Sequence, residues 1–203
     1  GAGSAGYGVF KILIKAGCKD IVVTDSRGAI YAGRREGIDN PYKQQVAEKT
    51  NSKKLSGNLA EIIRGADVFI GVSGRGGLLN AEMVHSMNHD AIVFALSNPN
   101  PEIFLSRALE SGARVVATGR SDFPNQVNNA VVFPSILRSL LDLRIKLLEE
   151  DTLVAIADAI ASLVEDTQLR EDYIIPKVND PRILSIVTQT MKEAIKRHIG
   201  RKQ

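Results

Sequence analysis

The sequence contains no tryptophan and only one cysteine, and aromatic residues make up just 5% of its 203 positions. With Cys18 alone, no intrachain disulfide and no cysteine-based zinc site can form, and we expect a reducing, cytoplasmic location. The longest apolar run, residues 153–164, is interrupted by Asp158 and is too short to cross a bilayer. We therefore expect no membrane partner.

The excess of positive charge is small. Lys and Arg number 26 and Asp and Glu 23, so the formal net charge is +3. A nucleic-acid-binding domain usually carries a basic stripe with interleaved aromatic residues, and the sequence has neither. We expect no nucleic-acid partner. A hydrophobic content of 44% over this length instead suits a large packed core.

Glycines at positions 1, 3 and 6 spell G-x-G-x-x-G directly before an apolar, helix-like run. In dinucleotide-binding folds these glycines allow a tight turn, a close approach to the pyrophosphate, and close packing of helix on strand. The pattern is weak alone, but the apolar segment 20–25 that follows ends in Asp25, 19 residues beyond Gly6. The fingerprint places the carboxylate that binds the adenosine ribose at this distance. Glycine loop, helix, strand and acid in this order predict a nucleotide site.

The same fingerprint requires a strand before its first glycine, and this chain starts on that glycine. A sheet without its central strand would leave unpaired buried backbone groups, at roughly 1–3 kcal/mol each. We therefore expect the first strand to lie upstream of Gly1, in a longer polypeptide of which this chain is the C-terminal portion.

The rest of the chain alternates short apolar runs with helical patterns before it becomes helical only. Strands are predicted at residues 67–72, 91–96 and 114–117, and helices at 42–51, 59–64, 80–87 and 101–110. The first of these helices should start at Asn40 and Pro41, with Asn40 as the N-cap and Pro41 in the first turn. Further helices are predicted at residues 127–148, 151–165 and 181–199. The pattern predicts an α/β, Rossmann-like, doubly wound parallel sheet with helices on both faces. We assign residues 1–125 to this core and residues 126–203 to a helical C-terminal extension of the same domain.

Two polar segments follow predicted strands, where ligands bind in such sheets. The first, residues 97–102, reads either as a strand-to-helix turn or as a site where the Asn98 amide faces a ligand. The second, residues 119–129, has four amide side chains before an apolar helix. Asn128 suits a helix N-cap, and a second amide directed at a ligand is the alternative.

Five segments carry a resemblance to a known family. They are residues 1–6 (GAGSAG), 23–28 (VTDSRG), 67–73 (DVFIGVS), 94–99 (FALSNP) and 117–129 (ATGRSDFPNQVNN). From Gly1 to about Pro181 the chain resembles the NAD-binding domain of malic enzymes, particularly the shorter prokaryotic type. Malic enzymes oxidise malate to oxaloacetate with NAD or NADP, then decarboxylate it with help from Mg²⁺ or Mn²⁺.

The resemblance implies a set of ligand contacts. Asn98 and Asn129 match asparagines that contact the substrate, the glycine loop matches the pyrophosphate site, and Asp25 matches the ribose-binding acid. The cofactor contacts expected are Gly1, Gly3, Ser4, Ala5, Gly6, Asp25, Ser26, Val72, Ser73 and Asn98. We expect NAD to be preferred because Asp25 repels a 2′-phosphate, although the neighbouring Arg27 partly offsets this and NADP remains an alternative.

The family's catalytic Tyr and Lys and its metal ligands lie upstream of the glycine loop, so we expect no catalytic residue and no metal ligand in this chain. Mg²⁺ or Mn²⁺ would be bound upstream. Glu102 and Asp122 flank the expected site, but each is expected to cap a turn. His85 and His89 are spaced like metal ligands but are expected to be exposed polar residues.

The resemblance predicts the cofactor-binding part of a malic enzyme. Its partners would be malate, an upstream domain of the same polypeptide and further copies in a homo-oligomer. Alone, the chain should bind nucleotide but turn over no malate. Two alternatives are a non-catalytic or regulatory nucleotide-binding domain and another Rossmann dehydrogenase, such as an amino-acid dehydrogenase. The segments around Asn98 and Asn129 argue against the latter.

Overall fold

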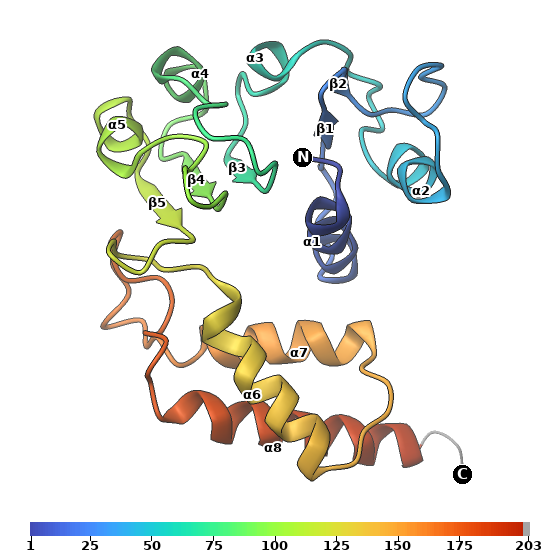
Figure 1. Cartoon of the computed structure of the whole chain (residues 1–203), viewed down its shortest axis with the longest axis vertical. Coiled ribbons are helices and arrows are strands. Elements are labelled where there is room, and N and C mark those ends of the chain that lie inside the picture. The colour runs from blue at the N-terminus through green and yellow to red at the C-terminus, as the bar shows by residue number, and fades with distance from the viewer. Residues whose placement is uncertain (201–203) are drawn as a thin grey trace. The chain divides into compact units, whose positions relative to one another are not determined.

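The computed structural model describes residues 1–200, and side chains as far as residue 197. The chain divides into two compact units, Gly1–Arg120 and Ser121–Gln203. The first contains all the strands of the described residues, and the second is built from helices (Figure 1). No helix among the described residues is both long enough and apolar enough to cross a membrane.

A parallel sheet organises the first unit. Its strands are β3 (Val68–Gly71), β4 (Ile92–Ala95) and β5 (Val115–Thr118), with β4 in the middle. Helices α3 (Leu59–Ile62), α4 (Ala81–His85) and α5 (Leu105–Glu110) alternate with them along the chain. Val93 and Ala95 are fully buried in β4, which suits an apolar run between two neighbouring strands. The predicted α/β class is confirmed.

Helix α1 (Ser4–Lys15) follows the glycine loop and buries Phe10 in a second cluster with Val23, Ile30 and Val46. Val46 lies on α2 (Pro41–Lys49). The start of α2 is as predicted, because Asn40 caps it by accepting a hydrogen bond from the amide of Lys43 and Pro41 occupies the first turn.

The strand predicted at residues 20–25 is wrong in extent. Only β1 (Thr24–Asp25) forms, and it pairs antiparallel with β2 (Gly28–Ala29) in a tight hairpin. The carbonyls of Ile21 and Val23 accept hydrogen bonds from the amides of Asn51 and Ile30, at 2.8 Å each. Within residues 1–200 no strand pairs with residues 20–23, so loop amides take the place of a ladder.

Helix α5 begins four residues later than the predicted start at residue 101. The carbonyl of Pro101 accepts from the amide of Gly77 at 3.0 Å, and that of Glu102 accepts from Leu79 at 2.9 Å. A helix from residue 101 would need these carbonyls for its own first turn. Tertiary hydrogen bonds therefore override the local preference of Pro101 for a helix start.

The second unit contains α6 (Asn129–Asp142), α7 (Glu150–Ala161) and α8 (Arg182–Gly200). These helices enclose an apolar cluster whose fully or nearly fully buried members are Val131, Ile156, Ile160, Leu163, Ile183, Val187 and Met191. Helix α6, with Pro134 inside it, stops at Asp142 rather than at the predicted Leu148. Arg144 adopts a φ of 54°, a left-handed conformation that ends a helix.

Candidate functional site

The three glycines of the G-x-G-x-x-G loop have different surroundings. A Cβ atom added at Gly1 would lie 2.9 Å from the Cα of Ser73 and 3.1 Å from the carbonyl oxygen of Val72. Gly6 is buried against the carbonyl of Gly1. Nothing lies within 4 Å of a Cβ added at Gly3. Gly1 and Gly6 therefore allow close internal packing, whereas Gly3 leaves the loop open on one side.

That open side is the start of α1. Gly3, Ser4 and Ala5 are exposed there, and Gly3 is the N-cap without a side-chain hydrogen bond. The first amides of an α-helix have no partner within the helix, and the helix dipole favours negative charge beside them. An exposed glycine backbone at the start of a 12-residue helix can thus receive a phosphate group. Val72 and Ser73, beyond β3, lie directly beside Gly1.

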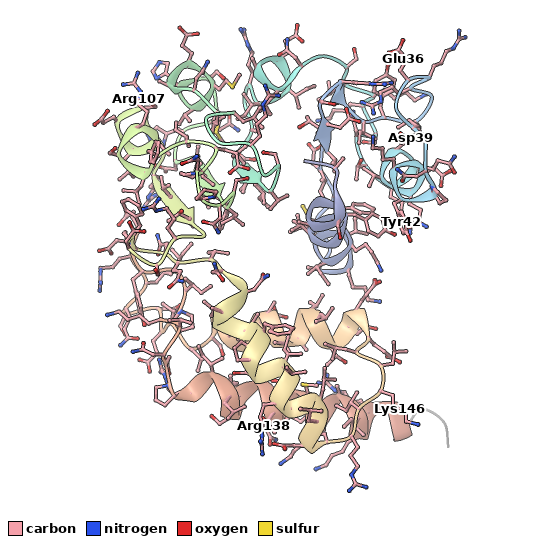
Figure 2. All side chains as sticks on the ribbon, viewed as in Figure 1. Glu36, Asp39, Tyr42, Arg107, Arg138 and Lys146 are labelled. Atoms are coloured by element: carbon pink, nitrogen blue, oxygen red, sulfur yellow. The ribbon has the colours of Figure 1, made fainter. Side chains whose placement is uncertain are left out.

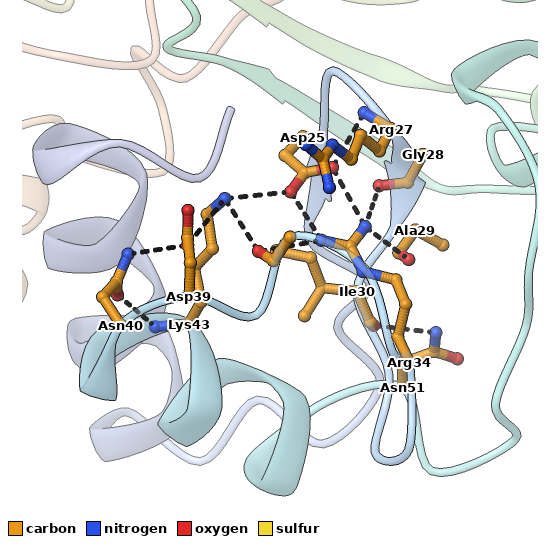
Figure 3. A network of polar contacts seen from close by, with 11 residues as sticks. Asp25, Arg27, Gly28, Ala29, Ile30, Arg34, Asp39, Asn40, Lys43 and Asn51 are labelled. Carbon is orange, nitrogen blue, oxygen red and sulfur yellow. Dashed lines mark hydrogen bonds and ion pairs between the residues drawn. The ribbon is translucent and has the colours of Figure 1, made fainter.

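Asp25 lies at the centre of a cationic network (Figure 3). Its Oδ1 accepts hydrogen bonds from the amide of Arg27 at 2.9 Å and from Nη1 of Arg34 at 3.0 Å, and its Oδ2 accepts from Nη2 of Arg34 at 2.6 Å. Nζ of Lys43 lies 3.2 Å from Oδ2. Burial raises the pKa of Asp25, but the hydrogen bonds from Arg34, Arg27 and Lys43 outweigh it and lower the pKa to about 2. Asp25 is therefore ionised at neutral pH.

Arg34 is buried as deeply as Asp25, with 8% of its side chain exposed. Besides Asp25, it donates to the carbonyls of Gly28 at 3.3 Å, Ala29 at 3.1 Å and Gly37 at 3.5 Å. Sequence reasoning found Asp25 but missed Arg34 and Lys43, which also hold its carboxylate. The only signal for them was basic residues 9 and 18 positions further on, in a loop and helix with no pairing pattern.

A hollow of about 440 Å³ opens beside the network. Arg27, Tyr31, Arg34, Arg35 and Glu36 contribute to its lining. Three of these five residues are arginines, and Glu36 is the one acid among them. Figure 2 shows Glu36 in the loop that leads to α2. Such a lining can attract an anionic group close to the Asp25 carboxylate.

Glu102 is the second buried carboxylate of the unit, with 0% of the residue exposed. Its Oε1 accepts hydrogen bonds from the amide and hydroxyl of Ser73, at 3.1 and 3.0 Å, and from the hydroxyl of Ser97 at 2.5 Å. Its Oε2 accepts from the amide of Ser97 at 3.1 Å. Burial raises the pKa of Glu102, but the hydrogen bonds from Ser97 and Ser73 outweigh it and lower the pKa. The prediction of an isolated turn cap is wrong for Glu102.

Asn98 lies exposed just beyond β4, and the Asn98–Pro99 peptide bond is cis. A Cβ added at Gly119, beyond β5, would lie 2.7 Å from Nδ2 of Asn98, so glycine at that position leaves room for the amide. No hydrogen-bond partner of the Asn98 side chain is found among the described residues. The side chain is thus able to bind a ligand, and its role stays a prediction.

The amides of the segment before α6 have separate roles. Asn128 caps α6 by accepting from the amide of Ala130 at 2.9 Å. Asn125 is buried, donates to the carbonyl of Glu171 at 2.7 Å and accepts from the amide of Ile174 at 2.9 Å. Asn129 is the first residue of α6 and is exposed. It therefore takes no part in these structural contacts, and its role as a substrate contact stays a prediction.

Within the part of the chain whose side chains are described, no group of three or more His, Cys, Asp or Glu residues is placed to hold a metal ion. His89 is exposed and lies beside Asp90, with their side chains 3.2 Å apart. His85 lies in the last turn of α4.

Comparison with known proteins gives consistent matches. The family model described as "Malic enzyme, NAD binding domain" matches residues 1–195. The bifunctional malic/malolactic enzyme of Bacillus subtilis is 50% identical over 194 residues, which cover 96% of this chain and 47% of that protein. The NAD-dependent malic enzyme of Geobacillus stearothermophilus is 47% identical over 194 residues, covering 96% of this chain and 40% of that protein.

A solved structure of a malic enzyme is also similar to this chain. The crystal structure of Entamoeba histolytica malic enzyme superposes with a TM-score of 0.87 at 37% identity, covering 96% of this chain and 42% of that one. The chain thus spans about half the length, or less, of the relatives that it matches.

Proposed function

The chain belongs to the malic enzyme family, as its NAD-binding domain, and we propose that it binds the dinucleotide cofactor of an enzyme that oxidises and decarboxylates malate. The observation that carries the proposal is the open side of the glycine loop. Gly3, Ser4 and Ala5 expose the start of α1 beside Ser73, whereas Gly1 and Gly6 are closed by internal packing. An open backbone at a helix N-terminus suits a pyrophosphate.

The cofactor, when bound, accepts a hydride from the substrate alcohol. The chain's own residues would bind and orient it. The amides of Gly3, Ser4 and Ala5 would hold the pyrophosphate. Ser26 and Asp25 would hold the adenosine ribose. The remainder of the dinucleotide would contact Val72, Ser73 and Asn98. These assignments rest on the position of each residue at the start of α1 or at the carboxyl ends of β1, β3 and β4.

We propose that NAD is preferred to NADP, with weaker discrimination than a lone acid would give. Asp25 is ionised and repels a 2′-phosphate. Arg34 and Lys43 neutralise much of that charge, and Arg27 adds a further cation in the adjoining hollow. The relative from Geobacillus, at 47% identity, is named NAD-dependent, which supports this order.

We propose further that Asn98 and Asn129 orient malate, since each carries an exposed amide. The base, the acid and the ligands of Mg²⁺ or Mn²⁺ would come from an upstream domain of the same polypeptide. The supports are the family resemblance and the share of each relative, about half or less, that this chain spans.

The test compares Gly3→Ala with Gly8→Ala. At both positions an added Cβ has nothing within 4 Å, so both variants should fold like the unchanged protein. Only Gly3 lies on the face proposed to receive the pyrophosphate. Gly3→Ala keeps the backbone amides, but its added methyl group should hold the pyrophosphate away from them and weaken NAD binding roughly 10- to 100-fold, as measured by calorimetry. Equal NAD affinity in both variants would overturn the proposed site.

A further inference from the structure

We propose that Glu102 is a positioning residue that holds the loops beyond β3 and β4 in the arrangement that the ligand site requires. The proposal rests on the function proposed above and extends it to a buried residue for which the sequence predicted only a turn cap. Glu102 is fully buried, so its carboxylate is closed to solvent. Its effect must pass through the groups that its carboxylate holds, which belong to Ser73 and Ser97.

On one side, Glu102 fixes the loop beyond β3. Both the amide and the hydroxyl of Ser73 donate to its Oε1. The hydroxyl of Ser73 in turn accepts from the amide of Arg75 at 3.1 Å, which shapes the next turn. The backbone of Ser73 also lies directly beside Gly1, so this loop adjoins the start of the glycine loop.

On the other side, Glu102 fixes the loop beyond β4. The amide and hydroxyl of Ser97 donate to its two carboxylate oxygens. The hydroxyl of Ser97 also accepts from the amide of Gly74 at 2.8 Å, which ties the two loops to each other. Asn98, the proposed substrate contact, follows Ser97 directly, so its backbone begins at a residue held by two hydrogen bonds to a buried anion.

The chemistry of this position calls for a carboxylate. Four donor groups converge on it, and only an ionised carboxylate offers acceptors at both oxygens without a donor of its own. Gly71 leaves space for the Glu102 carboxylate, because a Cβ at position 71 would lie 2.6 Å from Oε2 of Glu102. A glutamine would keep the shape but turn an NH₂ group toward an amide or hydroxyl donor.

The experiment uses Glu102→Gln in the full-length protein, with Glu110→Gln as the matched control. Glu110 ends α5, is exposed, and among the described side chains pairs only with Arg107, at 3.8 Å on the surface. Figure 2 shows Arg107 on α5. We expect Glu102→Gln to lower kcat/KM for malate roughly 10- to 100-fold, mostly through kcat, while the Kd for NAD changes only a few-fold. Amide hydrogen exchange should accelerate in residues 71–77 and 96–100 but not in α1.

Each outcome decides the matter. Kept exchange protection in both loops, or a kcat/KM equal to that of Glu110→Gln, would overturn the proposal. If the unchanged protein oxidises no malate with Mn²⁺ and NAD, the proposed function fails, and the exchange comparison alone then supports or refutes the role of Glu102. If Glu102→Gln does not fold, Ser97→Ala removes one donor to the carboxylate and the tie to Gly74, and the same readouts apply to it.

Discussion

Neutralising Asp25 should remove a defined part of the protein's stability. The pKa of Asp25 falls from its ordinary value of 3.8 to about 2, and only 10% of the side chain is exposed. Since one pKa unit corresponds to about 1.4 kcal/mol, the shift contributes about 2.5 kcal/mol to the free energy of unfolding at pH 7. Asp25→Asn also leaves the buried Arg34 without its carboxylate, so the loss at pH 7 should be at least this large.

The sign of the pH dependence follows from the depressed pKa. A carboxylate whose pKa is lower in the folded state stabilises it above pH 4 and loses that contribution as the pH falls toward 2. The difference in free energy of unfolding between the unchanged protein and Asp25→Asn should therefore be constant from pH 7 to about pH 5 and shrink below pH 4.

Urea unfolding followed by circular dichroism, at steps from pH 7 to pH 2.5, measures this difference. Asp20→Asn is the matched control, because the Asp20 carboxylate is 71% exposed and, within the part of the chain whose side chains are described, pairs only with the exposed Lys53, at 3.3 Å. Exposed pairs contribute about 0–1 kcal/mol, so this variant should stay close to the unchanged protein. A difference for Asp25→Asn that is as small as that for Asp20→Asn, or that does not narrow in acid, would refute the reasoning.

Three further predictions concern the ligands. Asp25→Ala removes the carboxylate that pairs with Arg34 and Lys43, so it should weaken NAD binding and shift the ratio of the Kd values for NAD and NADP roughly tenfold toward NADP in calorimetry. Tighter binding of NADP than of NAD by the unchanged protein would contradict the assigned preference. Asn129→Ala should lower kcat/KM for malate at least roughly tenfold with little change in NAD affinity, and unchanged malate kinetics would exclude this residue as a substrate contact. The 203-residue chain alone should bind NAD but form no NADH from malate and Mn²⁺, and sustained NADH production would show that the upstream chemistry is not needed.

Features set by neighbouring residues were predicted well. Asn40 and Pro41 predict the start of α2 because the N-cap bond closes within three residues, and Asn128 predicts the start of α6 in the same way. The strands of the sheet were predicted within two residues at either end, because buried parallel strands read as short apolar runs. Elements whose limits depend on distant partners were predicted less well.

Segments 20–25 and 101–110 show why elements with distant partners were predicted less well. Whether residues 20–23 form a strand depends on which backbone lies beside them, and in the described structure loop amides, not a strand, reach their carbonyls. The apolar pattern carries no information on that choice. At residue 101 the local signal favours a helix, yet two carbonyls are bonded to residues 77 and 79, more than 20 positions earlier. Tertiary contacts decide both cases.

The same distinction separates the two buried acids of the first unit. Asp25 was found because its distance from the glycine loop belongs to a fingerprint, although the cations that hold it were missed. Glu102 belongs to no fingerprint, and its partners Ser73 and Ser97 lie 29 and 5 positions away. In the chain it stands in a turn between two prolines and a helix, where an acid ordinarily faces solvent. Gly71 leaves space for the Glu102 carboxylate, but in the sequence a glycine inside an apolar strand indicates only that some group approaches closely and not which group it is.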